Sequence, residues 1–170
     1  MKLFPGGNVF EKAAVAVATG FGSGMAAPFA PGTFGSIPGV ALAVWLNRAF
    51  AGRIWIQTAA AIALAVAAIP FCGVAERVLG VKDDGRIVAD EWMLYPLAVI
   101  GLPLAEHPWL ILCTFATVRV FDIVKPPPAN RLQALPGGLG IVADDFAANI
   151  YSLAANWAAA HFIFGIPLPF

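Results

Sequence analysis

Long runs of apolar residues alternate with short polar segments along the chain. The clearest run, Ile54 to Ala75, has 22 residues and no charge, and about 20 apolar residues suffice to cross a bilayer core. A second uncharged run covers Phe146 to Ile166. Three shorter runs cover residues 37–46, 87–105 and 108–124. The pattern predicts an all-α protein, a small bundle of four to five membrane-spanning or membrane-embedded helices.

Composition supports a membrane protein with a single domain over residues 1–170. Hydrophobic residues make up 60% of the chain and charged residues 12%, whereas soluble domains are about 45–50% apolar and about 25% charged. The net charge is zero, so no nucleic-acid partner is expected. Cys72 and Cys113 lack metal-ligand spacing and are interpreted as free thiols. Residues 1–12 lack a long apolar stretch followed by a small-residue cleavage site, so no removable signal peptide is expected.

The basic residues are divided unequally between the two predicted faces of the membrane. If all five runs cross, side one receives residues 1–36, 76–86 and 125–145, and side two receives the loops near Arg48 to Arg53 and Glu106 to His107. Side two has only Arg48 and Arg53. The eight on side one are Lys2, Lys12, Arg77, Lys82, Arg86, Arg119, Lys125 and Arg131. This bias predicts that side one faces the cytoplasm, with Trp55 and Trp109 at the opposite interface.

The acidic residues are also concentrated on side one, and only Glu106 lies on side two. The nine on side one are Glu11, Glu76, Asp83, Asp84, Asp90, Glu91, Asp122, Asp144 and Asp145. The positive-inside rule does not account for acids, so the cluster indicates a cation site. The alternative is that charges merely avoid lipid, and it is the stronger interpretation for Asp83 and Asp84.

Two of the side-one segments suit a phosphate and a metal. Residues 31–36, Pro-Gly-Thr-Phe-Gly-Ser, precede an apolar run, and Ser36 is expected to cap its helix, with Pro38 in the opening turn. Glycine-rich approaches to helix starts suit phosphate, although a plain capped turn explains them equally well. Asp90 and Glu91 begin the third run, where acids are costly and therefore functional by default, unless they lie only in the headgroup zone.

Two further segments add cations and acids. Arg119 and Asp122 are three residues apart on one helix face, and Lys125 precedes three prolines that end the helix; a structural ion pair is the alternative. Asp144 and Asp145 follow a glycine run that would allow a ligand to approach closely. Their alternative explanation is the helix dipole, which favours acids at any helix start.

Together these residue types fit Mg²⁺-assisted hydrolysis of a phosphoryl group. Carboxylates suit Mg²⁺, cationic side chains stabilise phosphoryl oxygens, and a free carboxylate accepts the proton of the attacking water. Cys113 and Arg119 have the spacing of a cysteine-phosphatase loop, but the intervening apolar, glycine-free segment excludes that cradle. His107 and His161 are interpreted as interfacial or packed.

Four of these segments resemble the motifs of the phosphatidylglycerophosphatase A family. They are residues 19–36 with Pro-Phe-Ala-Pro-Gly-Thr-Phe-Gly-Ser, 85–91 with Gly-Arg-Ile-Val-Ala-Asp-Glu, 119–126 with Arg-Val-Phe-Asp-Ile-Val-Lys-Pro, and 137–145 with Gly-Gly-Leu-Gly-Ile-Val-Ala-Asp-Asp. The resemblance runs in order from about residue 18 to 155. It implies Mg²⁺-dependent hydrolysis of phosphatidylglycerophosphate to phosphatidylglycerol and phosphate at the bacterial cytoplasmic (inner) membrane.

The resemblance also implies a set of site residues. The implied catalytic residues are Asp90, Glu91, Asp145 and Arg119; the phosphate-binding residues are Thr33, Ser36, Arg119 and Lys125; the metal ligands are Asp90, Glu91, Asp122, Asp144 and Asp145. The chain departs from the family pattern where Leu94 and Asn149 replace usual glycines. A segment between Pro128 and Gly137 is also shortened, and its usual aspartate is missing.

Two other interpretations stay open from the sequence. A membrane transporter or ion-binding protein would also carry intramembrane acids, although its charges would be spread through the depth of the bilayer. A soluble helical bundle is the third possibility. The sequence does not indicate the oligomeric state, the number of metal ions, or which acid is a ligand and which a base.

Overall fold

The computed structural model describes residues 7–26 and 29–167, and within these ranges the chain is helical and contains no strand. Lys2, counted above with side one, and Pro28 of the first motif lie outside the described residues. The elements are α1 Val9–Ala18, η1 Gly20–Gly22, α2 Ser23–Ala26, α3 Pro31–Ala49, α4 Ile54–Leu79, α5 Ala89–Leu94, η2 Tyr95–Val99, α6 Leu110–Val124, α7 Ala129–Leu132, α8 Gly137–Ala158 and η3 Ala159–Ile163. The predicted all-α class is therefore confirmed.

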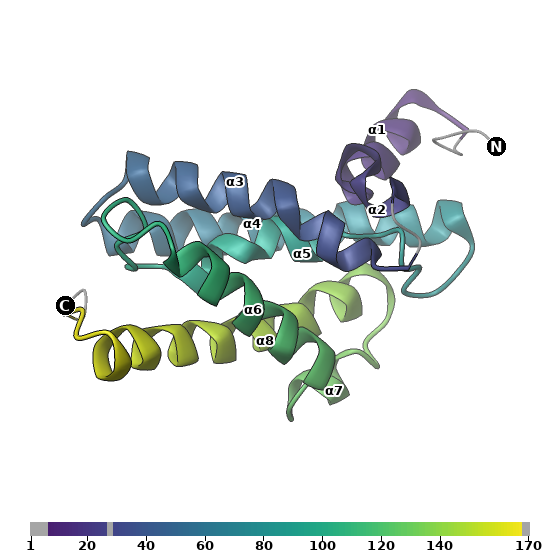
Figure 1. Ribbon diagram of the computed structural model, residues 1–170. Helices are drawn as coiled ribbons and strands as arrows, with labels where there is room; N and C mark the ends of the chain where they lie inside the picture. The colour runs from purple at the N-terminus through teal and green to yellow at the C-terminus, as the bar shows by residue number, and fades with distance from the viewer. Residues whose placement is uncertain (1–6, 27–28, 168–170) are drawn as a thin grey trace.

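The helices form a bundle whose connections alternate between two ends (Figure 1). The first end of the bundle is defined by α1, α2, residues 80–88 and residues 125–136. The second end holds residues 50–53, 101–109 and 164–167. This division reproduces the two sides predicted from the apolar runs. Trp55 lies in the first turn of α4 and Trp109 precedes α6, so both lie at the second end.

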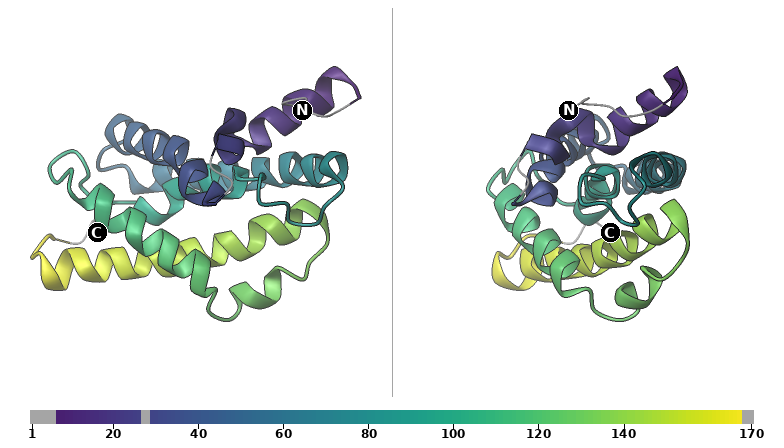
Figure 2. Two further views of the ribbon diagram at one scale, coloured as in Figure 1. Left: turned by 45° about the vertical axis from the view of Figure 1, so that its right-hand side comes forward. Right: turned by 90° about the vertical axis from the view of Figure 1, so that its right-hand side faces the viewer.

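The centre of the bundle is the short segment formed by α5 and η2, seen end-on between α3, α4, α6 and α8 in the right-hand view of Figure 2. Its residues from Ala89 to Ile100 are buried, apart from the half-buried Glu91 and Trp92. The expected span at residues 87–105 is wrong, because the α-helix stops at Leu94 and the chain turns at Gly101, whose φ is 72°. An apolar run in the core of a bundle resembles one that faces lipid.

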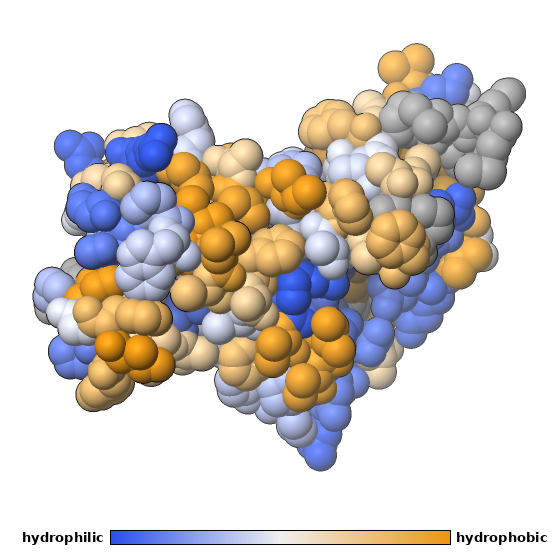
Figure 3. Space-filling view, viewed as in Figure 1, coloured by the Kyte–Doolittle hydropathy of each residue, from blue (hydrophilic) through white to orange (hydrophobic). Residues whose placement is uncertain are grey.

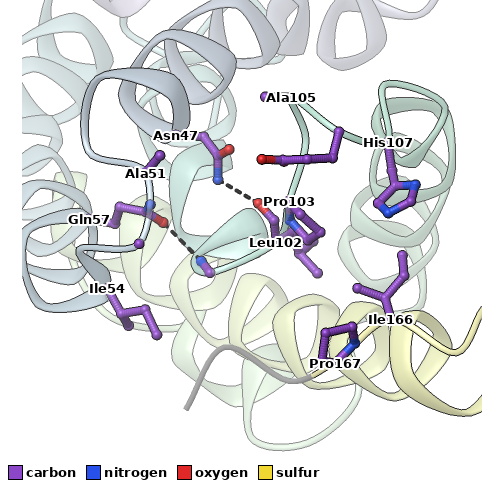
Figure 4. A pocket seen from close by; sticks show the side chains of 13 residues that line it. Asn47, Ala51, Ile54, Gln57, Leu102, Pro103, Ala105, His107, Ile166 and Pro167 are labelled. Carbon is purple, nitrogen blue, oxygen red and sulfur yellow. Dashed lines mark hydrogen bonds between the residues drawn. The ribbon is translucent and has the colours of Figure 1, made fainter.

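Side chains from the surrounding helices satisfy the backbone groups that this short segment leaves free at the second end. Asn47 Nδ2 donates to the Leu102 carbonyl over 2.8 Å, and the Gly101 N–H donates to Gln57 Oε1 over 2.8 Å (Figure 4). Asn156 and Trp157 donate to the carbonyls of Ala98 and Ile100. Buried backbone groups require such partners, so these polar residues are structural. Asn47 and Gln57 also border a cavity of about 450 Å³.

Within the described ranges, only α4 is long and apolar enough to cross a membrane by length and composition. Of the four to five membrane-spanning or membrane-embedded helices expected, α4 is therefore the clear candidate for a span. The expected runs at 37–46 and 108–124 are helices α3 and α6, and α8 begins at Gly137, nine residues before the expected Phe146. Large apolar side chains are nevertheless exposed around the bundle. They include Trp45, Trp55, Leu112, Ile123 and Phe162.

Glycines let α3 and α8 approach their neighbours closely. A Cβ on Gly35 or Gly39 would lie within 2.7 Å of Val88 or Trp92 atoms, so α3 packs directly on the chain entering α5. A Cβ on Gly138 would lie 2.1 Å from the Ile69 carbonyl oxygen of α4. At the start of α8, Gly138 thus serves close packing of α8 on α4.

Candidate active site

A polar pocket of about 540 Å³ opens at the first end of the bundle. Figure 3 shows a hydrophilic hollow in the middle of this face, with apolar residues of α3 and α6 on either side. Four separate segments line it: residues 29–33, the loop before α5 with the first turn of α5, the end of α6, and α8 through Asp145. The structure therefore brings together the four segments that the sequence singled out.

The first turn of α5 contributes Asp90 and Glu91, and both line the pocket. Asp90 is 8% exposed, and its Oδ1 has no hydrogen-bond partner among the described residues. Glu91 Oε2 lies 3.2 Å from the Ser36 hydroxyl and 3.4 Å from Arg119 Nη1. Glu91 is thus held between α3 and α6, whereas one oxygen of Asp90 is available to a ligand.

The end of α6 supplies the cations. Arg119 Nη1 lies 3.0 Å from Asp122 Oδ2, as expected for residues three apart on a helix. The helix ends at Val124, and Lys125 adopts a left-handed conformation with φ of 45° that turns the chain into the prolines. The predicted position of Lys125 at the mouth is confirmed, since it lines the pocket beside Arg119.

The two acids of α8 take different positions. Asp144, 2% exposed, pairs with Lys125 Nζ over 2.5 Å and does not line the pocket. Asp145, 4% exposed, lines it and has no cationic group within 4 Å in the described ranges. Both lie in the third turn of α8, so the helix-dipole explanation for the pair does not apply.

Burial and crowding of negative charge favour the protonated acids. Burial raises the pKa of Asp90 well above its ordinary value, and the charges of Glu91 and Asp122 raise it further. Burial likewise raises the pKa of Asp145, with Asp122 and Asp90 adding to the effect. Burial raises the pKa of Glu91 to about 7, although Arg119 opposes the shift.

Lys125 responds in the opposite sense to its surroundings. Burial alone lowers the pKa of an ammonium group, but the hydrogen bond to Asp144 and the nearby charges of Asp145 and Asp122 outweigh it and raise the pKa of Lys125. Lys125 is therefore a fixed positive charge at the pocket. A phosphate group that enters the pocket meets this charge and that of Arg119.

The N-terminal motif behaves differently from the prediction. The helix begins at Pro31 with Ala30 before it and no side-chain cap, so the expected cap by Ser36 is wrong. Ser36 is buried in the second turn, where its hydroxyl lies 2.8 Å from the Gly32 carbonyl and orients Glu91 from behind. Thr33 lines the pocket.

Sequence reasoning assigned no site role to one acid that lines the pocket. Asp83 lines it and accepts a 2.9 Å hydrogen bond from Gln133 Nε2; its place in the acidic loop on side one was the available signal. Asp84, by contrast, pairs with Arg86 over 2.6 Å and does not line the pocket. Gly32 of the N-terminal motif also lines the pocket, and a Cβ there would lie 2.1 Å from Glu91 Oε1.

The donor set suits a hard cation, although its ligands are not preassembled. Among residues 7–26 and 29–167, no three Asp, Glu, His or Cys side chains are grouped so as to hold a metal ion. Mg²⁺, however, is usually held by one or two carboxylates, several waters and substrate phosphate. Asp90 and Asp145, buried and lacking ion-pair partners in these ranges, fit that requirement.

The cysteines and histidines to which the sequence analysis gave no catalytic role do not line the pocket. Cys113, in the middle of α6, is a free thiol like the buried Cys72. His107 and His161 lie towards the second end, His107 beside the cavity there. At the positions that depart from the family pattern, Leu94 fills the core, and Asn149 Nδ2 donates to the Asp145 carbonyl over 2.9 Å.

Comparisons with known proteins agree with these motifs. The family model described as phosphatidylglycerophosphatase A matches residues 16–160. A Bacteroides thetaiotaomicron protein named putative phosphatidylinositol-3-phosphatase is 32% identical over 84% of this chain and 93% of its own length. Proteins named phosphatidylglycerophosphatase A from Haemophilus influenzae and Escherichia coli are 35% and 30% identical, over 86% and 85% of this chain and 88% and 82% of theirs. No solved structure matches this chain.

Proposed function

This chain belongs to the phosphatidylglycerophosphatase A family, and on that premise we propose that it hydrolyses the phosphate monoester of phosphatidylglycerophosphate to phosphatidylglycerol and phosphate, with Mg²⁺ as cofactor. The family makes it a phosphoric monoester hydrolase of phospholipid metabolism. The transporter or ion-binding alternative is therefore set aside. The headgroup needs a test, because one relative is named for an inositol lipid.

The observation that carries the proposal is a pocket in which acids and cations meet beside apolar helices. Arg119 and Lys125 line it together with Asp90, Glu91, Asp122 and Asp145. Cationic donors aimed at a phosphoryl group stabilise the charge on its equatorial oxygens in the transition state. The unpaired acids would repel that phosphate unless a divalent cation or protons neutralised them.

Mg²⁺ would be held by Asp90 and Asp145, and when bound it polarises the phosphoryl group and lowers the pKa of water. Glu91, which lines the pocket next to Asp90, accepts the proton of the attacking water. The oxygen of that water bonds to phosphorus as the bond from phosphorus to the glycerol oxygen breaks. The departing glycerol oxygen takes a proton from solvent. Ser36 and Arg119 hold Glu91 in place throughout.

Location at the bacterial cytoplasmic membrane belongs to the same proposal. It is supported by the length and apolarity of α4 and by the exposed apolar side chains around the bundle. The basic residues concentrated at the first end favour a cytoplasmic position for the pocket. The surrounding lipid and the lipid substrate would then both contact the exposed apolar side chains around the bundle.

The test is phosphate release by the detergent-purified chain from a panel of lipid phosphomonoesters. The panel contains phosphatidylglycerophosphate, phosphatidic acid and phosphatidylinositol 3-phosphate, each with Mg²⁺ and with EDTA. We expect phosphatidylglycerophosphate to be the best substrate and EDTA to abolish release. Preference for the inositol lipid, or full activity in EDTA, would contradict the proposal.

Two variants test whether hydrolysis takes place in the pocket. Asp90→Asn keeps the shape of the side chain and removes its charge, so kcat/KM is expected to fall about 100-fold or more. Asp84→Asn is the matched control, since Asp84 lies at the same end but pairs with Arg86 outside the pocket. It is expected to retain activity within about threefold. Circular dichroism would establish that both variants are folded.

A further inference from the structure

An apolar groove of about 350 Å³ lies between α3 and α6. Six apolar side chains line it, three from each helix: Ile37, Val40 and Ala41, and Ile111, Leu112 and Phe115. The same two helices contribute Thr33 and Arg119 to the polar pocket. One pair of helices therefore carries a polar site and an apolar groove along a single seam.

Residue spacing makes the groove continuous with the polar pocket. On α3, Ile37 follows Thr33 by four residues and Ala41 follows Ile37 by four, so all three share one helix face. On α6, Phe115 and Ile111 precede Arg119 by four and eight residues on its face. Four residues advance a helix by about 6 Å. The groove thus begins about one turn from the pocket and ends about 12 Å from it, against roughly 15 Å for the hydrocarbon of one leaflet.

The groove has a fixed floor and an open side. Val40, Ile111 and Phe115 pack against the buried core, and the Phe115 ring lies 6.5 Å from that of Tyr95. Ile37 and Leu112 form the rims, and they are 55% and 76% exposed. Figure 3 shows apolar residues of α3 and α6 on this open face beside the hydrophilic hollow. A long apolar molecule reaches such a groove from the side without any opening of the bundle.

We propose that this groove binds one acyl chain of the lipid whose phosphate monoester occupies the polar pocket. The inference rests on the proposed function and adds an acyl-chain site to it. The order of polarity along the seam is that of an amphiphile, with cations at one end and apolar side chains alone beyond them. A second apolar groove lies between α4 and α8, but α4 does not line the polar pocket.

The groove positions the lipid more than it increases affinity from the membrane. Lipid tails and apolar side chains are similar surroundings for an acyl chain, so transfer between them gains little. A chain held in the groove fixes the depth and direction of the phosphate near Arg119. Binding energy from a remote part of a substrate is then used to orient the reacting group, and substrates that lack this part lose kcat as well as affinity.

The test compares Ala41→Trp with Ala63→Trp. Ala41 lines the groove and is exposed, so an indole ring there fills the groove without disturbing the core. Ala63 is an exposed alanine of α4 that lines none of the pockets described, and it receives the same substitution. Each protein is assayed with phosphatidylglycerophosphate in mixed micelles and with its deacylated, water-soluble headgroup. Leu112→Gln on the opposite rim is a second groove variant.

We expect the parent chain and Ala63→Trp to prefer the acylated substrate in kcat/KM by about tenfold or more. Ala41→Trp and Leu112→Gln should lose most of this preference and retain activity on the headgroup. If the parent cleaves the lipid and both groove variants keep the full preference, the groove proposal is overturned while the proposed function stands. If the parent cleaves neither substrate, the proposed function itself fails. Light scattering identifies a groove used between two copies, because Ala41→Trp would then change the oligomeric mass with no change in preference.

Discussion

Asp90 and Asp145 are acids that the fold removes from water while leaving them without an ion-pair partner in the described residues. Such burial is costly for a charged group, and proteins retain it where a ligand supplies the missing charge. The neighbouring Glu91 and Asp144 are both engaged, by Arg119 and Lys125 respectively. Two acids of the pocket, Asp90 and Asp145, therefore lack a cationic partner among the described residues. Glu91 and Asp122 in the pocket hold Arg119 in position, and Asp144 beside the pocket holds Lys125.

This arrangement makes stability depend on pH in a predictable direction. The pKa of Glu91 is raised from 4.5 to about 7, so the folded protein favours its protonated form. As pH rises from 4.5 through about 7, the metal-free protein should become less stable, by on the order of 5 °C in Tm. Mg²⁺ favours the ionised acids, so its stabilising effect should grow over the same range.

Thermal unfolding in EDTA and in Mg²⁺ at several pH values would measure both effects. Glu91→Gln should weaken the dependence without abolishing it, because the pKa values of Asp90 and Asp145 are also raised. A metal-free protein whose Tm rises between pH 4.5 and 7 would contradict this account.

At the scale of helices, glycines determine how closely the site segments approach. The sequence predicted that the motifs of α3 and α8 belong to the site. It also predicted that their glycines allow a ligand to approach the backbone. In the structure, Gly35 and Gly39 face the chain of α5, and Gly138 faces the backbone of α4. A glycine required by a neighbouring helix and one required by a ligand look alike in a single sequence. The partner segment becomes known only when the chain is folded.

Two alanine substitutions should separate the two roles. A Cβ at Gly138 meets backbone atoms of Ile69 and Gly73, which cannot move aside, so Gly138→Ala should destabilise the protein by about 2–3 kcal/mol. A Cβ at Gly32 meets the end of the Glu91 side chain and Arg119, which can rotate away. Gly32→Ala should therefore lower kcat strongly and change Tm little. Parallel unfolding and activity measurements check both outcomes, and equal losses of stability in the two variants would contradict the distinction.

At the scale of the whole molecule, the sequence predicted the helical class and the alternation of connections between two ends. It failed on the number of spans, because residues 87–105 are apolar for a different reason: they form the core rather than a lipid-facing surface. It also placed the start of α8 too late, since glycines and acids were taken as a loop. Hydropathy reports that a residue is unfavourable in water. It does not show whether that residue faces lipid or packs against other helices.

The orientation of the bundle is a prediction that labelling can decide. Lys82 lies in the exposed loop at the first end and Arg53 in that of the second. In right-side-out vesicles, an impermeant maleimide should label Arg53→Cys, and should label Lys82→Cys only after the membrane is opened. The parent chain gives the background from Cys72 and Cys113. Labelling of Lys82→Cys in sealed vesicles would place the pocket on the outside.

The central position of α5 has a consequence for how the enzyme fails. Catalytic groups commonly lie on peripheral loops, which fluctuate and lose their shape before the rest of a protein. The proposed site residues Asp90 and Glu91 instead belong to the segment that the surrounding helices enclose. Fraying of the chain ends leaves these two carboxylates in place. Heat inactivation and cooperative melting of the bundle should then be one event.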